Sequence, residues 1–166
     1  PSKTNTILSV CGCGNNGGDG LAVARLLYLA GYRVEILLPM GTEKMTAETR
    51  AQYETIRQYQ IPEITELPES SSYAVIIDAL FGIGLSRKIG ENLYKLVEKL
   101  NQIPAYRIAV DIASGISADT GTIQGIAFDA DTTVTFGFAK YGQLFYPGAE
   151  YTGRLIVADI GIDTYS

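Results

Sequence analysis

Short runs rich in apolar residues recur along the chain, and most are separated from the next run by a stretch with helical spacing. The apolar runs cover residues 6–11, 32–38, 74–78, 107–111, 132–136 and 155–158. Helices are predicted at residues 21–30, about 45–60 and 91–101. Strands without polar alternation are typical of a parallel sheet with both faces covered. The sequence therefore predicts an α/β layered fold, with only loops and strands expected after residue 111.

Length, charge and cysteine content limit the number of domains, the class of partner and the redox state of the thiols. The 166 residues predict one domain spanning 1–166. A net charge of −5 argues against nucleic acid or an anionic membrane as the partner, and no apolar run is long enough to span a bilayer. Cys11 and Cys13 lie too close in sequence for a relaxed disulfide, and two thiols do not complete a zinc site. We therefore expect reduced thiols and a cytoplasmic protein.

The chain contains no histidine. This excludes Ser-His-Asp and Cys-His catalysis, and it excludes zinc sites that need imidazole. Acid–base chemistry must then come from carboxylates, Lys, Tyr, Cys or the substrate itself. Any metal ion is expected to have oxygen ligands.

Three of the predicted strands lead into a segment that combines an acidic residue with glycines. Asp19 lies in the segment after the first strand, while Asp78 and Asp111 end the third and fourth strands along the chain. One such Asp is commonly a cap or a turn residue. Ligands, however, bind outside the carboxyl ends of parallel strands. Three acidic residues at that edge, each beside a glycine-rich segment, therefore predict a functional site.

The first of these segments allows several interpretations. Residues 12–17 match the pattern G-x-G-x-x-G, and Glu35 lies near where a ribose-binding acidic residue would be sought. Asp19, however, would place a negative charge where a pyrophosphate should bind. No Lys-Ser/Thr pair follows the glycines, so the phosphate-binding P-loop pattern fails. Local rules leave a tight strand-to-helix turn, a ligand loop and an NAD site as alternatives.

Longer signatures distinguish among these alternatives. They are Gly14-Asn15-Asn16-Gly17-Gly18-Asp19-Gly20, Asp78-Ala79-Leu80-Phe81-Gly82-Ile83-Gly84-Leu85-Ser86-Arg87, and Val110-Asp111-Ile112-Ala113-Ser114-Gly115. In this order and at this spacing they resemble the NAD(P)H-hydrate epimerase family, also called the YjeF N-terminal domain family. The resemblance implies a three-layer, Rossmann-like α/β/α sandwich with a mostly parallel central sheet. It also implies epimerisation of the R and S forms of hydrated NADH and NADPH (NADHX and NADPHX) at nicotinamide C6.

The resemblance also implies roles for individual residues. Asp111 would be the catalytic group and would meet the nicotinamide end of the substrate. A potassium ion would bind to Asn16, Asp78 and Ser114 through oxygen atoms. The remaining substrate-binding residues would be Asn15, Asn16, Gly17, Gly18, Asp19, Gly82, Ile83, Gly84, Leu85, Ser86, Arg87 and Lys88.

The proposed substrate suits a chain without histidine. Its reacting carbon carries a hydroxyl group next to the ring nitrogen, so it can open to an aldehyde or lose hydroxide to an iminium ion. One carboxylate near that hydroxyl suffices in principle, and Lys140 is a second candidate for charge or proton work.

Family members begin with a helical segment, and the resemblance implies that this segment is absent here. It also implies a homodimer and a natural chain that continues into a dehydratase domain. The alternative function is a non-catalytic nucleotide-binding or protein-interaction domain of the same fold. Retention of Asn16, Asp19, Asp78, Asp111 and Ser114 favours the enzyme.

Overall fold

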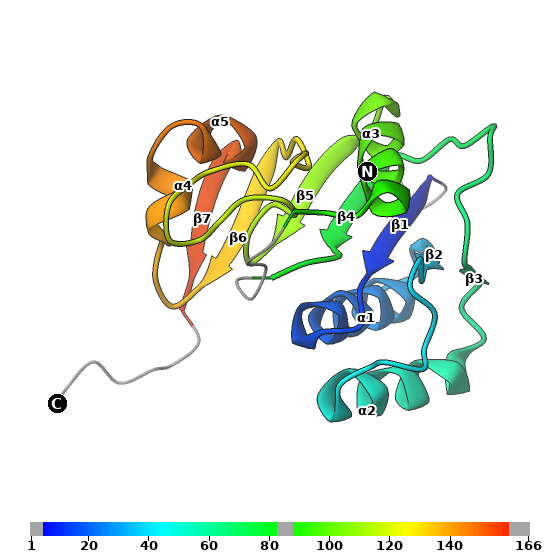
Figure 1. The fold of residues 1–166 in the computed structure, drawn as a ribbon. Coiled ribbons are helices and arrows are strands. Elements are labelled where there is room, and N and C mark those ends of the chain that lie inside the picture. The colour runs from blue at the N-terminus through cyan, green and yellow to red at the C-terminus, as the bar shows by residue number, and fades with distance from the viewer. Residues whose placement is uncertain (1–4, 83–87, 160–166) are drawn as a thin grey trace, which may run out of the picture.

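A central sheet of parallel strands organises this computed structural model, which describes residues 5–82 and 88–159. The strand order is β3-β2-β1-β4-β5-β6-β7, and each neighbouring pair is parallel (Figure 1). The strands are β1 (Thr6–Cys11), β2 (Arg33–Leu37), β3 (Glu63–Ile64), β4 (Val75–Ala79), β5 (Tyr106–Val110), β6 (Thr132–Phe136) and β7 (Arg154–Ala158). The predicted parallel α/β sheet is confirmed.

Helices cover both faces of the sheet (Figure 1). Ile7 of β1 packs in the same cluster as Leu27 of α1, whereas the next residue, Leu8, packs with Leu100 of α3. Because successive strand residues point to opposite faces, α1 and α3 lie on opposite sides of the sheet. The longer helices are α1 (Asn15–Leu29), α2 (Ala47–Ile56) and α3 (Glu91–Gln102). The three-layer prediction is therefore confirmed.

Several short elements were not predicted. Two helices, α4 (Tyr141–Leu144) and α5 (Gly148–Thr152), lie beside β7 in a region where no helix was expected (Figure 1). Each is too short to show a helical repeat in the sequence. The same holds for β3 and for the 3₁₀ helix η1 (Arg57–Tyr59), which follows α2. None of the helices within residues 5–82 and 88–159 has both the length and the apolar character needed to cross a membrane.

Helix α1 begins six residues before its expected start at residue 21, at Asn15. The Asn-Asn-Gly-Gly-Asp string is therefore the first part of the helix and not a loop before it. Glycine and asparagine are poor helix formers, so local propensity places the start too late. Packing against the sheet overrides that propensity.

The glycines of α1 allow this close packing. A Cβ atom added to Gly17 would lie 1.9 Å from the carbonyl oxygen of Gly12, and one added to Gly20 would lie 2.4 Å from the Cβ of Ala79. These contacts bring the start of α1 directly against the carboxyl ends of β1 and β4. The polar residues at the start of α1 are thereby held at the edge where the predicted site lies.

Candidate functional site

The carboxyl ends of β1 and β4 form a topological switch point. From β1 the chain proceeds to β2 and β3 on one side, then returns to β4 on the other side of β1. Connections that leave two adjacent strands in opposite directions leave a crevice at their carboxyl ends, where open α/β sheets bind ligands. Asn16 follows β1 at this point, and Asp78 lies within β4.

Asp78 and Ser114 form a buried hydrogen-bonded pair. The Ser114 hydroxyl donates to Asp78 Oδ1 at 2.6 Å, and the Ser114 backbone N–H donates to Oδ2 at 2.7 Å. The backbone N–H of Leu80 also donates to Asp78 Oδ1 at 3.2 Å. These bonds lower the pKa of Asp78, but burial is the larger effect and raises it to about 6. A cation beside this pair would offset the buried negative charge.

Asn16 supplies a second polar group at the switch point. Its side-chain nitrogen and oxygen are both buried, and neither has a hydrogen-bond partner within the described residues. Such atoms are uncommon in folded proteins and indicate a missing partner. Asn16 lies against Gly82, while the neighbouring backbone N–H of Phe81 donates to the Ser114 hydroxyl at 2.9 Å. Asn16 and Ser114 therefore flank the same short segment after β4.

The residues predicted to bind potassium fit a hard monovalent cation by their chemistry. Asn16, Asp78 and Ser114 carry oxygen atoms, and the Asn16 oxygen lacks a partner in the part of the chain that the structure describes. Clusters of three or more His, Cys, Asp or Glu side chains are not found in that part. The donor set is thus unlike that of zinc or another transition metal.

Asp111 lies just after β5 in a second polar cluster. Its carboxylate Oδ1 accepts from the Lys140 ammonium group at 2.9 Å and from the Thr135 hydroxyl at 3.0 Å. The backbone of Asp111 has a φ of 70°, a region that is uncommon for residues other than glycine. Gln143 Nε2 donates to the Asp111 carbonyl oxygen at 2.6 Å and so supports this conformation. Strained residues of this kind concentrate at functional sites.

Asp19, an exposed residue of α1, lies within electrostatic range of Asp111. Desolvation raises the pKa of Asp19, and the negative charge of Asp111 raises it further. The structure therefore brings these two carboxylates close enough to interact electrostatically.

Cys11 is not suited to act as a nucleophile, because burial raises the pKa of its thiol to about 12.

The other predicted substrate-binding residues differ in their burial and in their contacts. Asn15 is exposed, and its side-chain oxygen accepts from the Thr46 hydroxyl at 2.7 Å, on the side of α2. Gly17 and Gly18 are buried and make close packing contacts. Gly82 is partly buried and Lys88 is exposed. The remaining predicted phosphate-loop residues, Ile83, Gly84, Leu85, Ser86 and Arg87, lie outside the described residues.

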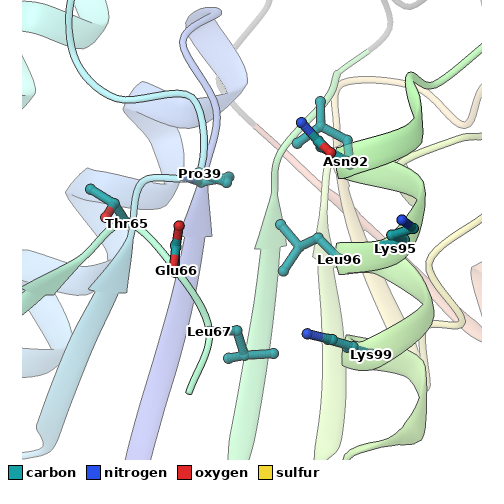
Figure 2. Close-up of a pocket in the computed structure, with 9 residues that line it drawn as sticks. Pro39, Thr65, Glu66, Leu67, Asn92, Lys95, Leu96 and Lys99 are labelled. Carbon is teal, nitrogen blue, oxygen red and sulfur yellow. The ribbon is translucent and has the colours of Figure 1, made fainter. Parts of the chain in front are cut away.

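A separate groove of about 470 Å³ lies between α3 and the segment after β3 (Figure 2). Thr65, Glu66 and Leu67 line one side, while Lys95, Leu96 and Lys99 project from α3 on the other. The groove does not include Asp78, Asp111 or Ser114. The chemistry is therefore assigned to the polar clusters at the strand ends and not to this groove.

Two residues of the Asp111 cluster carry no recognisable functional signal in the sequence. Thr135 lies within β6 and is buried, and Gln143 lies in the unpredicted helix α4. A threonine in a strand is ordinary, so Thr135 carried no signal beyond its place near the carboxyl end of β6. Nothing in the sequence singled out Gln143.

Comparison with known proteins identifies relatives over most of the chain. The family model for YjeF-related protein N-terminus matches residues 2–142. A curated relative from Oenococcus oeni, named NAD(P)H-hydrate epimerase, is 42% identical over 94% of this chain and 74% of its own length. A relative of the same name from Limosilactobacillus fermentum is 43% identical over 93% of this chain and 74% of its own length.

A solved structure supports the same fold. The crystal structure of the yeast protein YNL200c superposes with a TM-score of 0.73 at 23% sequence identity. The match covers 95% of this chain and 66% of the yeast chain. At this level of identity the likeness establishes the architecture alone.

Proposed function

Because the chain belongs to the family of YjeF-related protein N-termini, we propose that it is an NAD(P)H-hydrate epimerase. The reaction interconverts the R and S forms of NADHX and NADPHX at C6 of the nicotinamide ring. The observation that carries this proposal is the Asp111 carboxylate, which accepts hydrogen bonds from Lys140 and Thr135 at the ligand-binding edge of the sheet. Curated relatives that cover most of the chain carry the same name.

The chemistry at C6 needs one proton transfer in each direction. Asp111 accepts the proton of the C6 hydroxyl, the oxygen forms a carbonyl, and the C6–N1 bond breaks. The electron pair of that bond moves to N1, from where it is delocalised over the conjugated carboxamide. Rotation exposes the other face of the carbonyl, N1 attacks it, and Asp111 returns the proton to the oxygen. If N1 is protonated while the ring is open, Asp19, whose pKa is raised by desolvation and by Asp111, can supply that proton and take it back when N1 attacks the carbonyl.

We further propose that Asn16, Asp78 and Ser114 bind a potassium ion beside this site. When bound, the ion would supply fixed positive charge that offsets buried Asp78 and favours anionic groups of the substrate. Asn16 would give it the oxygen that lacks a partner within the described residues. From the family resemblance we also propose that the protein acts in the cytoplasm as a homodimer.

Potassium chloride should stabilise the protein more than sodium chloride at the same ionic strength. Binding to the folded state at ten times the dissociation constant contributes about 1.4 kcal/mol, which corresponds to a rise in Tm of about 3–5 °C. Thermal unfolding in the two salts measures this difference. Asn16→Ala should abolish it, whereas Asn92→Ala, which changes a residue of the groove, should retain it. Equal Tm values in the two salts would argue against the cation site.

The proposed function is tested by incubating the protein with one epimer of NADHX in potassium buffer. Chromatography should show the other epimer forming faster than in buffer alone, with no net loss of NADHX. Tight binding without acceleration would instead support the alternative of a non-catalytic nucleotide-binding domain. Hydride transfer with ordinary NADH would favour a dehydrogenase.

A further inference from the structure

The ammonium group of Lys140 is fully engaged by the protein. It donates to Asp111 Oδ1 at 2.9 Å, to Thr135 Oγ1 at 2.6 Å and to the carbonyl oxygen of Phe136 at 3.1 Å. A lysine ammonium group has three N–H donors. All of them therefore have acceptors within the protein, and none remains to donate to a substrate. Whatever Lys140 contributes to the reaction must act through its neighbours.

The two oxygens of Asp111 differ in their surroundings. Oδ1 accepts from both Lys140 and the Thr135 hydroxyl. Both of these hydrogen bonds from described residues go to Oδ1, and neither goes to Oδ2. The pair is largely shielded from water, because the side chains of Lys140 and Asp111 are 20% and 18% exposed. Oδ1 is thus the anchored oxygen, and Oδ2 is left to accept the proton of the substrate.

Gln143 links the backbones that carry the two charged side chains. Its Nε2 donates to the carbonyl oxygen of Asp111 at 2.6 Å, and its Oε1 accepts from the backbone N–H of Lys140 at 2.8 Å. The backbone N–H of Asp111 donates in turn to the Val134 carbonyl oxygen at 2.7 Å. These bonds hold Asp111 at its positive φ and keep Lys140 at a fixed distance from it. The ion pair is therefore partly buried and tied to the surrounding backbone by hydrogen bonds, unlike an exposed surface contact.

We propose that Lys140 is a positioning residue for the epimerisation, one that anchors Oδ1 of Asp111 and offsets its negative charge so that Oδ2 faces the C6 hydroxyl. Thr135 bridges the pair, since it accepts from Lys140 and donates to Asp111. This inference rests on the proposed epimerase function. Loss of the charge should impair the proton transfer, whereas binding of the nucleotide should be affected much less.

Steady-state kinetics of variants at position 140 test this role. Lys140→Met should lower kcat about 100-fold with a much smaller change in KM, because a misplaced general base loses much of its contribution. Lys140→Arg, which keeps the charge, should recover part of kcat. Lys140→Gln can still donate to Asp111 but carries no charge, so its kcat should also be low. This variant keeps the test valid if Lys140→Met does not fold. Lys95→Met is the matched control, since it removes an exposed ion pair with Glu91 at 3.1 Å.

The outcomes separate this proposal from the function on which it rests. An inactive wild-type protein would contradict the epimerase function itself. An active wild-type protein with unchanged kcat in Lys140→Gln would overturn the role of Lys140. The same conclusion would follow if Lys140→Arg were as impaired as Lys140→Gln, or if Lys95→Met lost as much kcat as Lys140→Met.

Discussion

Replacement of Asp111 by Asn should lower kcat by about 10²–10⁴-fold, the usual contribution of a general acid–base group. Asparagine has nearly the shape of aspartate, and its oxygen can still accept from Thr135 and Lys140. It cannot take a proton from the C6 hydroxyl, so the substrate would bind but turn over slowly. Initial rates of epimer conversion over a range of substrate concentrations give kcat and KM separately.

Asp129→Asn is the matched control for this variant. Asp129 is exposed, and its backbone N–H donates to Asn101 Oδ1 at 2.8 Å, away from the Asp111 cluster. The control should keep the wild-type kcat. A kcat for Asp111→Asn within twofold of the wild type would show that another group carries the proton.

Gly17→Ala should destabilise the folded protein by about 2–3 kcal/mol or more, the range expected when a tightly packed site receives an extra atom. In an exposed helix the same change would stabilise by about 1 kcal/mol, because alanine is the better helix former. Here the new Cβ would lie 1.9 Å from the carbonyl oxygen of Gly12. That oxygen belongs to the backbone and cannot rotate away. Packing therefore outweighs helix propensity, and Tm should fall by about 4–12 °C.

Gly14→Ala provides the control within the same string of residues. A Cβ at Gly14 meets no atom within 4 Å, and the φ of −76° suits any residue. Its Tm should stay close to that of the wild type, apart from the small cost of alanine at a helix N-cap. Thermal unfolding of both variants makes the comparison. Equal Tm values for Gly17→Ala and Gly14→Ala would show that α1 does not need the close approach to Gly12.

The sheet could be predicted from sequence because its strands are apolar on both faces. The parallel direction of the strands also follows from the helices that alternate with them, whereas the order of the strands in the sheet was not predicted. The start of α1 could not be predicted, since its first turns contain Asn15, Asn16, Gly17 and Gly18, which disfavour a helix locally. The contacts that reverse this preference join residues far apart in the chain.

The candidate site was predictable to the extent that it lies at strand ends. Asp78 and Asp111 both end apolar runs, and Ser114 follows shortly after. The hydrogen bond between Asp78 and Ser114 was not predictable, nor was the anchoring of Asp111 by Thr135 and Gln143. These contacts depend on loop geometry after β5 and on the short helix α4. Substrate binding by Asn15, Gly17 and Gly18 stays a prediction, while the structure gives the two glycines a packing role as well.

Proton NMR of the C6 proton during incubation with a single NADHX epimer tests the central claim most directly. The signal of the added epimer should decay towards an equilibrium mixture of both epimers, at a rate proportional to the concentration of protein. The total intensity of the two signals should stay constant, and Asp111→Asn should slow the decay almost to that of buffer alone. A wild-type rate equal to the spontaneous rate, in potassium buffer and with folded protein, would contradict the assignment of this site as an epimerase.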